Sequence, residues 1–241
     1  MGGLIGVLTS DASGMGLLYE ILYLLLSAAI VVFLTMPIHE WAHGFAAGKL
    51  GDPTARYYGR LRLNPMAHID PVGALGILLF GIGWAKPVPV DTRYFKNPKK
   101  DMALTAFAGP LANLIMAFVS VFVANLFGFI SYFVNGLPGY ILTFLAVVFY
   151  RVALINISLA IFNLVPIPPL DGSKILAAFL SDRAYYSLMR YERYFSFILL
   201  GLIFFSTRFS TILSVMVSGV FNAFDTVTWW PFEAILRAII N

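Results

Sequence analysis

A nearly uncharged run from Gly16 to Ile38 leads directly into the pentapeptide HEWAH at residues 39–43. The run is long enough to cross a bilayer, because a helix needs about 20 apolar residues to span the hydrocarbon. In the pattern HExxH the two imidazoles share one helix face and bind zinc, while the Glu beside them serves as a general base. Ionisable groups within a membrane segment mark a functional site by default. The sequence therefore predicts a hydrolytic site, which uses water as a reactant, inside a membrane.

The composition favours a membrane protein over a soluble one. Sixty per cent of the 241 residues are apolar and 12% are charged, whereas about a quarter are charged in ordinary globular domains. Because no linker, repeat or low-complexity tract divides the chain, we expect residues 1–241 to form a single integral-membrane domain. Its catalytic core would cover about residues 17–175, with further membrane segments and an interfacial tail at 176–241. The absence of cysteine excludes disulfides and thiolate metal ligands.

The basic residues are concentrated in two stretches, which fits membrane orientation better than nucleic-acid binding. Of the sixteen Lys and Arg residues, nine lie between Lys49 and Lys100 and four between Lys174 and Arg193. Residues 1–18 and 135–139 carry none. By the positive-inside rule the basic stretches face the cytoplasm, and the N-terminus and residues 135–139 face outward. We therefore expect a multi-pass protein of the cell membrane with its HExxH motif toward the cytoplasmic face. We do not expect the first apolar run to be a cleaved signal peptide, because no basic region precedes it.

The apolar runs predict an all-α polytopic protein with about five or six membrane-embedded segments. Three runs qualify as spans by length: Gly16–Ile38, Met102–Val134 and Tyr140–Val165. Val72–Trp84 is short and favours a re-entrant hairpin or an oblique helix. The run 194–224 is interrupted by Thr207-Arg208 and is compatible with one long helix or two pieces. The Trp229-Trp230-Pro231 tail resembles an interfacial amphipathic segment.

Two short stretches predict a small membrane-associated β-hairpin or sheet. Residues 55–63 (ARYYGRLRL) partly alternate polar and apolar side chains, as a strand does. Residues 86–91 (KPVPVD) carry prolines at alternate positions, which restricts them to an edge strand or an extended loop.

A catalytic zinc usually takes three protein ligands and leaves one position for water, so a third ligand is needed. A metzincin would place a His six residues after His43, but that residue is Lys49. The remaining candidates are His68, Asp70 and Asp171. We favour Asp171 because the charge distribution puts it at the same membrane face as HExxH, and the prolines before it unwind the chain. His68 and Asp70 would then cap a turn, or orient a zinc-bound imidazole by contacting the ring nitrogen that does not bind the metal.

Five motifs in order resemble the site-2 protease family of intramembrane zinc metalloproteases, in its compact bacterial branch without PDZ or CBS domains. They are HEWAH, GRLRLNPMAHIDPVG, GWAKPVPVD, AGPLAN and FNLVPIPPLDG, and they cover roughly residues 30–175. The resemblance implies one zinc per chain bound by His39, His43 and Asp171, with Glu40 as the base and Asn163 near the active site. It also implies that a membrane-associated sheet receives the substrate.

The chemistry expected of such a site is hydrolysis of a peptide bond in or near a transmembrane segment. Glu40 would take a proton from water and pass it to the leaving nitrogen. Asn163 is the candidate donor to the oxyanion, and Asn113 is a weaker one that also suits a role in helix contacts. A helical substrate must unwind first, because its carbonyls are hydrogen-bonded within the helix.

Two other classes of protein remain as alternatives. In a metal or ion transporter, polar residues would line a path on both sides of the midplane, whereas the ionisable cluster here lies on one side. In a scaffold that binds a helical partner, Glu40 would have no special role. The sequence identifies no partner for Arg151, which lies well inside an apolar run.

Overall fold

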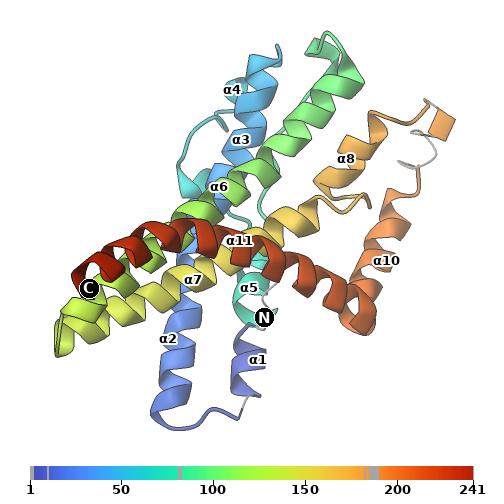
Figure 1. The fold of residues 1–241 in the computed structure, drawn as a ribbon. Coiled ribbons are helices and arrows are strands. Elements are labelled where there is room, and N and C mark those ends of the chain that lie inside the picture. The colour runs from blue at the N-terminus through green and yellow to red at the C-terminus, as the bar shows by residue number, and fades with distance from the viewer. Residues whose placement is uncertain (1–2, 10, 81–82, 182, 185–189, 241) are drawn as a thin grey trace.

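The computed structural model describes residues 3–9, 11–80, 83–181, 183–184 and 190–240. Within these residues the regular structure is helical (Figure 1). The elements are α1 (Leu4–Leu8), α2 (Met15–Ile30), the π-helical η1 (Val31–Thr35), α3 (Met36–Lys49), α4 (Thr54–Tyr57), η2 (Pro65–Ala67), α5 (Pro71–Phe80), η3 (Thr92–Tyr94), α6 (Pro98–Phe133), α7 (Leu137–Asn163), α8 (Asp171–Ala177), α10 (Glu192–Phe205) and α11 (Thr207–Ile240).

Four helical stretches of the described chain are long and apolar enough to cross a membrane. They are Met15–Lys49, Pro98–Phe133, Leu137–Asn163 and Thr207–Ile239. The predicted all-α class is thereby confirmed for the described residues, and the four candidate spans fit the predicted polytopic arrangement. The short run before Trp84 is a single helix, α5, and residues 81–82 of that run lie outside the described residues. The count of five or six embedded segments stays a prediction, because it includes such short pieces.

The helix that carries the HExxH motif is continuous with the first span. α2, η1 and α3 follow one another without a loop. Pro37 has no N–H to donate to the turn before it, so the regular ladder of hydrogen bonds is interrupted there. A π-helical turn lies just before the interruption, as π-turns in α-helices often do near functional sites.

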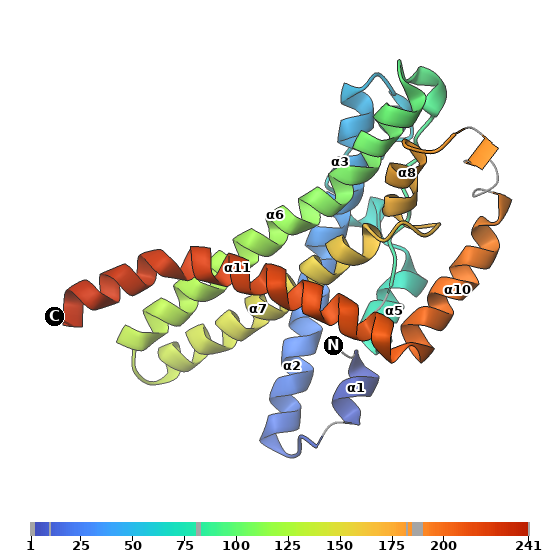
Figure 2. The ribbon, with the colours of Figure 1, turned by 45° about the vertical axis from the view of Figure 1, so that its right-hand side comes forward.

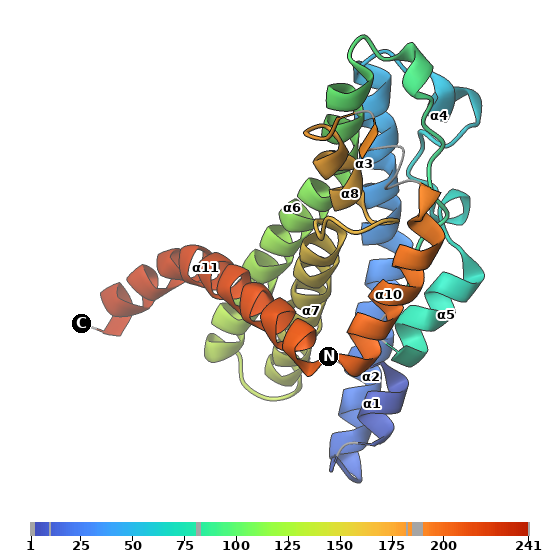
Figure 3. The ribbon, with the colours of Figure 1, turned by 90° about the vertical axis from the view of Figure 1, so that its right-hand side faces the viewer.

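Small side chains allow the central helices to approach closely. α6 and α7 form a hairpin that packs on α3 through α6, and α11 crosses both helices of the hairpin (Figure 2). The residues at these contacts are mostly Ala and Val and are fully buried, as is usual where membrane helices meet: Ala117, Val121, Ala124, Val152, Ala153 and Ala160. α8 lies against α6 at the end of the hairpin that is nearer α3 (Figure 3).

The β-sheet prediction is wrong for the residues that the structure describes. Residues 54–57 form the short helix α4, which begins where Asp52 Oδ1 accepts the N–H of Thr54 at 2.9 Å. Gly59, with φ of +64°, then turns the chain. The guanidinium of Arg60 donates to the carbonyls of Lys86 and Pro87 at 2.7 and 3.0 Å. A side chain thus supplies hydrogen bonds that a neighbouring strand would have supplied.

Residues 83–91 are extended without a strand partner along their length. One isolated bridge pairs Ile69 with Ala85. Beyond it, the N–H of Asp91 donates to Asp52 at 2.8 Å, and Pro87 and Pro89 have no N–H to donate. The extended-loop alternative predicted for 86–91 is therefore the one observed.

The C-terminal run forms two helices rather than one. α10 ends at Phe205, Ser206 is extended, and α11 begins at Thr207. α11 continues through Pro231 to Ile240, so the predicted interfacial tail is part of a long helix. Near its middle, Asp225 and Thr228 accept hydrogen bonds from Asn125 of α6 at 3.0 and 2.9 Å. These polar contacts fix the position of α11 across the hairpin.

Candidate metal centre

His39 and His43 lie one turn apart on the buried face of α3. Their Nε2 atoms are 3.1 Å apart, and each residue is 9% exposed. Two ring nitrogens at this distance form a hydrogen bond only if one of them carries a proton. Otherwise both present a lone pair toward the same point, as the spacing of the motif predicted.

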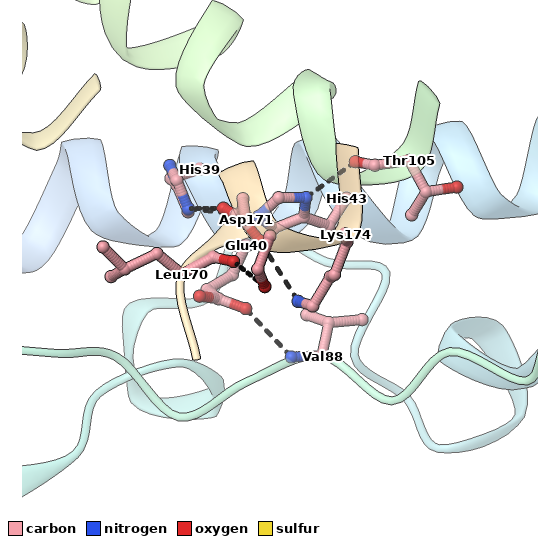
Figure 4. A network of polar contacts seen from close by, with 9 residues as sticks. His39, Glu40, His43, Val88, Thr105, Leu170, Asp171 and Lys174 are labelled. Atoms are coloured by element: carbon pink, nitrogen blue, oxygen red, sulfur yellow. Dashed lines mark hydrogen bonds and ion pairs between the residues drawn. The ribbon is translucent and has the colours of Figure 1, made fainter. Parts of the chain in front are cut away.

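Asp171 approaches the two histidines from a different part of the chain. α7 ends at Asn163, the proline-rich residues 164–170 are irregular, and Asp171 is the first residue of α8. Its Oδ2 atom lies 3.5 Å from Nε2 of His39 and 3.2 Å from Nε2 of His43 (Figure 4). Burial alone would raise the pKa of Asp171, but hydrogen bonds from the two imidazoles when they carry a proton on Nε2, together with the ammonium of Lys174, lower it below its ordinary value. The carboxylate is therefore ionised at neutral pH.

The geometry of this group fits a metal ion. Two ligands about 2.0–2.1 Å from a tetrahedral zinc stand about 3.3–3.4 Å apart, and the three separations here are 3.1, 3.2 and 3.5 Å. Nδ1 of His43 donates to the carbonyl of Thr105 at 2.8 Å. Because the proton is then on Nδ1, the lone pair is on Nε2, which faces the other two residues. Nδ1 of His39 is buried without a partner among the described residues.

Gly109 allows α6 to pass directly against the histidines. A β-carbon at this position would lie 2.4 Å from Nε2 of His43 and 2.6 Å from Cε1 of His39. The structure identifies the imidazoles as what Gly109 contacts.

Glu40 is held beside the histidines by the extended segment 83–91. Its Oε2 atom accepts the backbone N–H of Val88 at 2.9 Å, and the residue is 8% exposed (Figure 4). One carboxylate oxygen is thus fixed by a backbone amide, and the segment that supplies this amide is extended alongside α3.

A cavity of about 570 Å³ opens beside these groups. Its wall combines the polar residues named above with apolar side chains from α3, α6, α7 and α10: Met36, Ala106, Leu159, Phe162 and Leu199. Asn163 and Asn113 both line it. Asn113 is 2% exposed and its Oδ1 has no hydrogen-bond partner among the described residues, so that oxygen forms no hydrogen bond between helices there.

The two other candidate ligands lie elsewhere. Nε2 of His68 donates to the carbonyl of Arg62 at 2.8 Å. Oδ1 of Asp70 accepts the N–H groups of Val72 and Gly73 at 2.9 Å and thereby caps α5. Asp70 reaches the cavity wall, but the residues close enough to share one metal ion in the described chain are His39, His43 and Asp171.

Three contacts of the site were not anticipated from the sequence. They are the Thr105 carbonyl behind His43, the Val88 amide at Glu40, and Lys174, whose Nζ lies 3.2 Å from Oδ1 of Asp171. Backbone groups have no signature of their own in a sequence. Lys174 stands three residues after Asp171, so the i,i+3 rule would have paired the two residues had a helix been expected there.

The chain is similar to known zinc metalloproteases. Residues 141–206 match Peptidase family M50. A Bacillus subtilis protein named "Putative zinc metalloprotease YwhC" is 39% identical over 159 residues, which cover 66% of this chain and 71% of that protein. "Putative zinc metalloprotease Rip2" of Mycolicibacterium smegmatis is 29% identical, over 58% of this chain and 51% of its own length. "Zinc metalloprotease MJ0392" of Methanocaldococcus jannaschii is 26% identical, over 64% and 34%. No solved structure matches at comparable significance.

Proposed function

Because this chain belongs to peptidase family M50, the site-2 protease family of zinc metalloproteases, we propose that it hydrolyses peptide bonds in or near transmembrane segments of membrane proteins. One observation carries the proposal. The group His39, His43 and Asp171 and the carboxylate of Glu40 line one cavity, whose remaining wall is largely apolar. A site of this kind suits a polypeptide that comes from a lipid environment.

We assign the zinc to His39, His43 and Asp171. The donor set of two imidazoles and one carboxylate is typical of catalytic zinc and leaves a position free. When bound, zinc lowers the pKa of water to about 7 and polarises the scissile carbonyl. The Thr105 carbonyl keeps the Nε2 lone pair of His43 directed at the metal position.

Glu40 is the general base. The Val88 N–H holds Oε2, so Oε1 is the oxygen that takes the proton from water and delivers it to the leaving nitrogen. Asn163 is our candidate donor to the oxyanion, since it lines the same cavity at the end of α7. Asn113, which is buried and lines the same cavity, is the second candidate and would donate through its Nδ2 amide group.

The substrate would bind as an extended strand against residues 83–91. This segment forms one wall of the cavity, and its prolines leave it without a continuous ladder partner. A transmembrane helix that has unwound needs hydrogen bonds for its exposed backbone groups, and the backbone groups of residues 83–91 that are not already paired would supply some of them. The segment would therefore receive the substrate, a role that the family resemblance assigns to a membrane-associated sheet.

The active site would face the cytoplasm and the N-terminus the outside. In Figure 1, the α6–α7 turn and the beginning of α2 lie away from α4. The basic residues between Lys49 and Lys100 belong to the α4 end, whereas residues 1–18 and 135–139 carry no basic residue. We also propose that residues 1–241 act as one protease domain.

The experiment compares wild type, E40Q, D171A and D70A, purified in detergent and matched for folding by gel filtration. Zinc content is measured by mass spectrometry, and cleavage of a panel of single-span transmembrane peptides is read from the product masses. We expect about one zinc per chain in wild type, retained in E40Q and D70A and lost in D171A. Cleavage should disappear in E40Q. Cleavage that persists in E40Q would exclude the proposed mechanism.

A further inference from the structure

Lys174 contacts the oxygen of Asp171 that the histidines do not. Its Nζ atom lies 3.2 Å from Oδ1, whereas Oδ2 of the same carboxylate faces His39 and His43 at 3.5 and 3.2 Å (Figure 4). The two oxygens of Asp171 therefore have different partners. One faces an ammonium group, and the other faces the position in which a metal would lie.

The difference matters because a carboxylate can bind a metal through one oxygen or through both. A catalytic zinc keeps one position open for water or substrate. A second oxygen from Asp171 would crowd that position. An ammonium that donates to Oδ1 forms a charge-assisted hydrogen bond, which competes with the metal for the oxygen's lone pairs.

We propose that Lys174 is a positioning residue that retains Oδ1 of Asp171, so that the carboxylate binds zinc through Oδ2 alone. The proposal rests on the proposed function, in which Asp171 is a zinc ligand. Both residues belong to the first turn of α8, at i and i+3, so the helix itself keeps them on one face. Lys174 also lines the cavity, and its side chain is 39% exposed.

An ordinary helix-stabilising ion pair is the simpler interpretation, and such pairs on a surface contribute little. Asp171, however, is only 6% exposed, and its partner approaches within the cavity. The two interpretations differ in what they predict for the metal. A pair that only stabilises α8 would leave zinc coordination unchanged when it is removed, or would weaken zinc binding by loosening Asp171.

The test measures zinc coordination by X-ray absorption spectroscopy and zinc affinity by competition with a chelator. The variants are K174Q and K174R, with K49Q as the control. Lys49 is exposed on α3 above the ring of Phe45, so K49Q removes the same charge from the same end of the protein without touching Asp171. K174M repeats the measurement if K174Q is unstable.

In K174Q we expect one additional oxygen neighbour at zinc, a zinc affinity equal to or about tenfold above wild type, and at least a tenfold loss of cleavage. K174R and K49Q should show the wild-type spectrum. A wild-type spectrum for K174Q, or weaker zinc binding, would overturn the proposal for Lys174. If D171A also keeps its zinc, the ligand set of the proposed function fails instead, so the two failures are distinguishable.

Discussion

Replacing Gly109 by Ala is expected to disrupt the metal centre while leaving the fold intact. The added β-carbon would lie 2.4 Å from Nε2 of His43, whereas ordinary contact begins at 3.4 Å. The α6 backbone cannot withdraw, because α6 packs against both α3 and α7. The imidazoles of His39 and His43 must therefore move, and the gap between 2.4 and 3.4 Å sets the displacement at about 1 Å.

A displacement of this size is large for a metal ligand and small for a fold. Metal–ligand distances in good sites are held to about 0.2 Å, and outer contacts that orient a ligand are worth about 10–100-fold in metal affinity. We expect G109A to lose zinc affinity by at least about 100-fold, since both histidines are affected. Overpacking costs about 1–3 kcal/mol, and the better helix propensity of Ala offsets up to about 1 kcal/mol of it.

The assay is zinc affinity by chelator competition, paired with an unfolding curve of the metal-free protein in detergent. Gly128 provides the control, because it lies in the same helix and a β-carbon there would meet nothing within 4 Å. G128A should bind zinc as wild type does. If G109A bound zinc with wild-type affinity, the contact between α6 and the two imidazoles would not constrain the metal centre, and the argument would be refuted.

Three further predictions concern other parts of the molecule. N163A should keep its zinc and lose about 10²–10³ in kcat if Asn163 stabilises the oxyanion; an unchanged kcat contradicts that role. Arg151 lies 2.6 Å from Glu20. Because each single variant leaves one charge unpaired, the double variant E20Q/R151Q should lose about 1 kcal/mol less unfolding free energy than E20Q and R151Q lose in sum. Since the chain has no cysteine, S13C and K96C can each be labelled with an impermeant maleimide on intact cells; we expect labelling of S13C alone, and the reverse would invert the proposed topology.

The residues of the candidate site were predictable where chemistry imposes a spacing. HExxH places two imidazoles on one helix face, and the prolines before Asp171 mark a break in the helix that lets a carboxylate turn inward. The structure brings these three residues together. The family resemblance, which the comparisons confirm, rests on the same motifs.

What the sequence did not reveal depends on contacts between distant segments. Arg151 had no assigned partner, because Glu20 lies 131 residues away and the cation also sits over the ring of Tyr23 at 5.2 Å. The strand predicted at 55–63 failed for a local reason. Its alternation is short and incomplete, and Gly59 turns the chain while Arg60 takes over the hydrogen bonds of the neighbouring segment.

The extended segment 83–91 links the base to the place where a substrate would bind. Val88 holds Glu40 through its N–H, and Pro87 and Val90 of the same segment line the cavity with it. The segment is itself anchored at two points. The N–H of Lys86 donates to the carbonyl of His68 at 2.8 Å, and the N–H of Asp91 donates to the carboxylate of Asp52. A polypeptide that adds to this edge would therefore contact the same backbone that fixes the carboxylate. If substrate binds there, its binding would be mechanically coupled to the position of Glu40, and substitutions at the anchors should then change kcat even though the anchors are distant from the metal position.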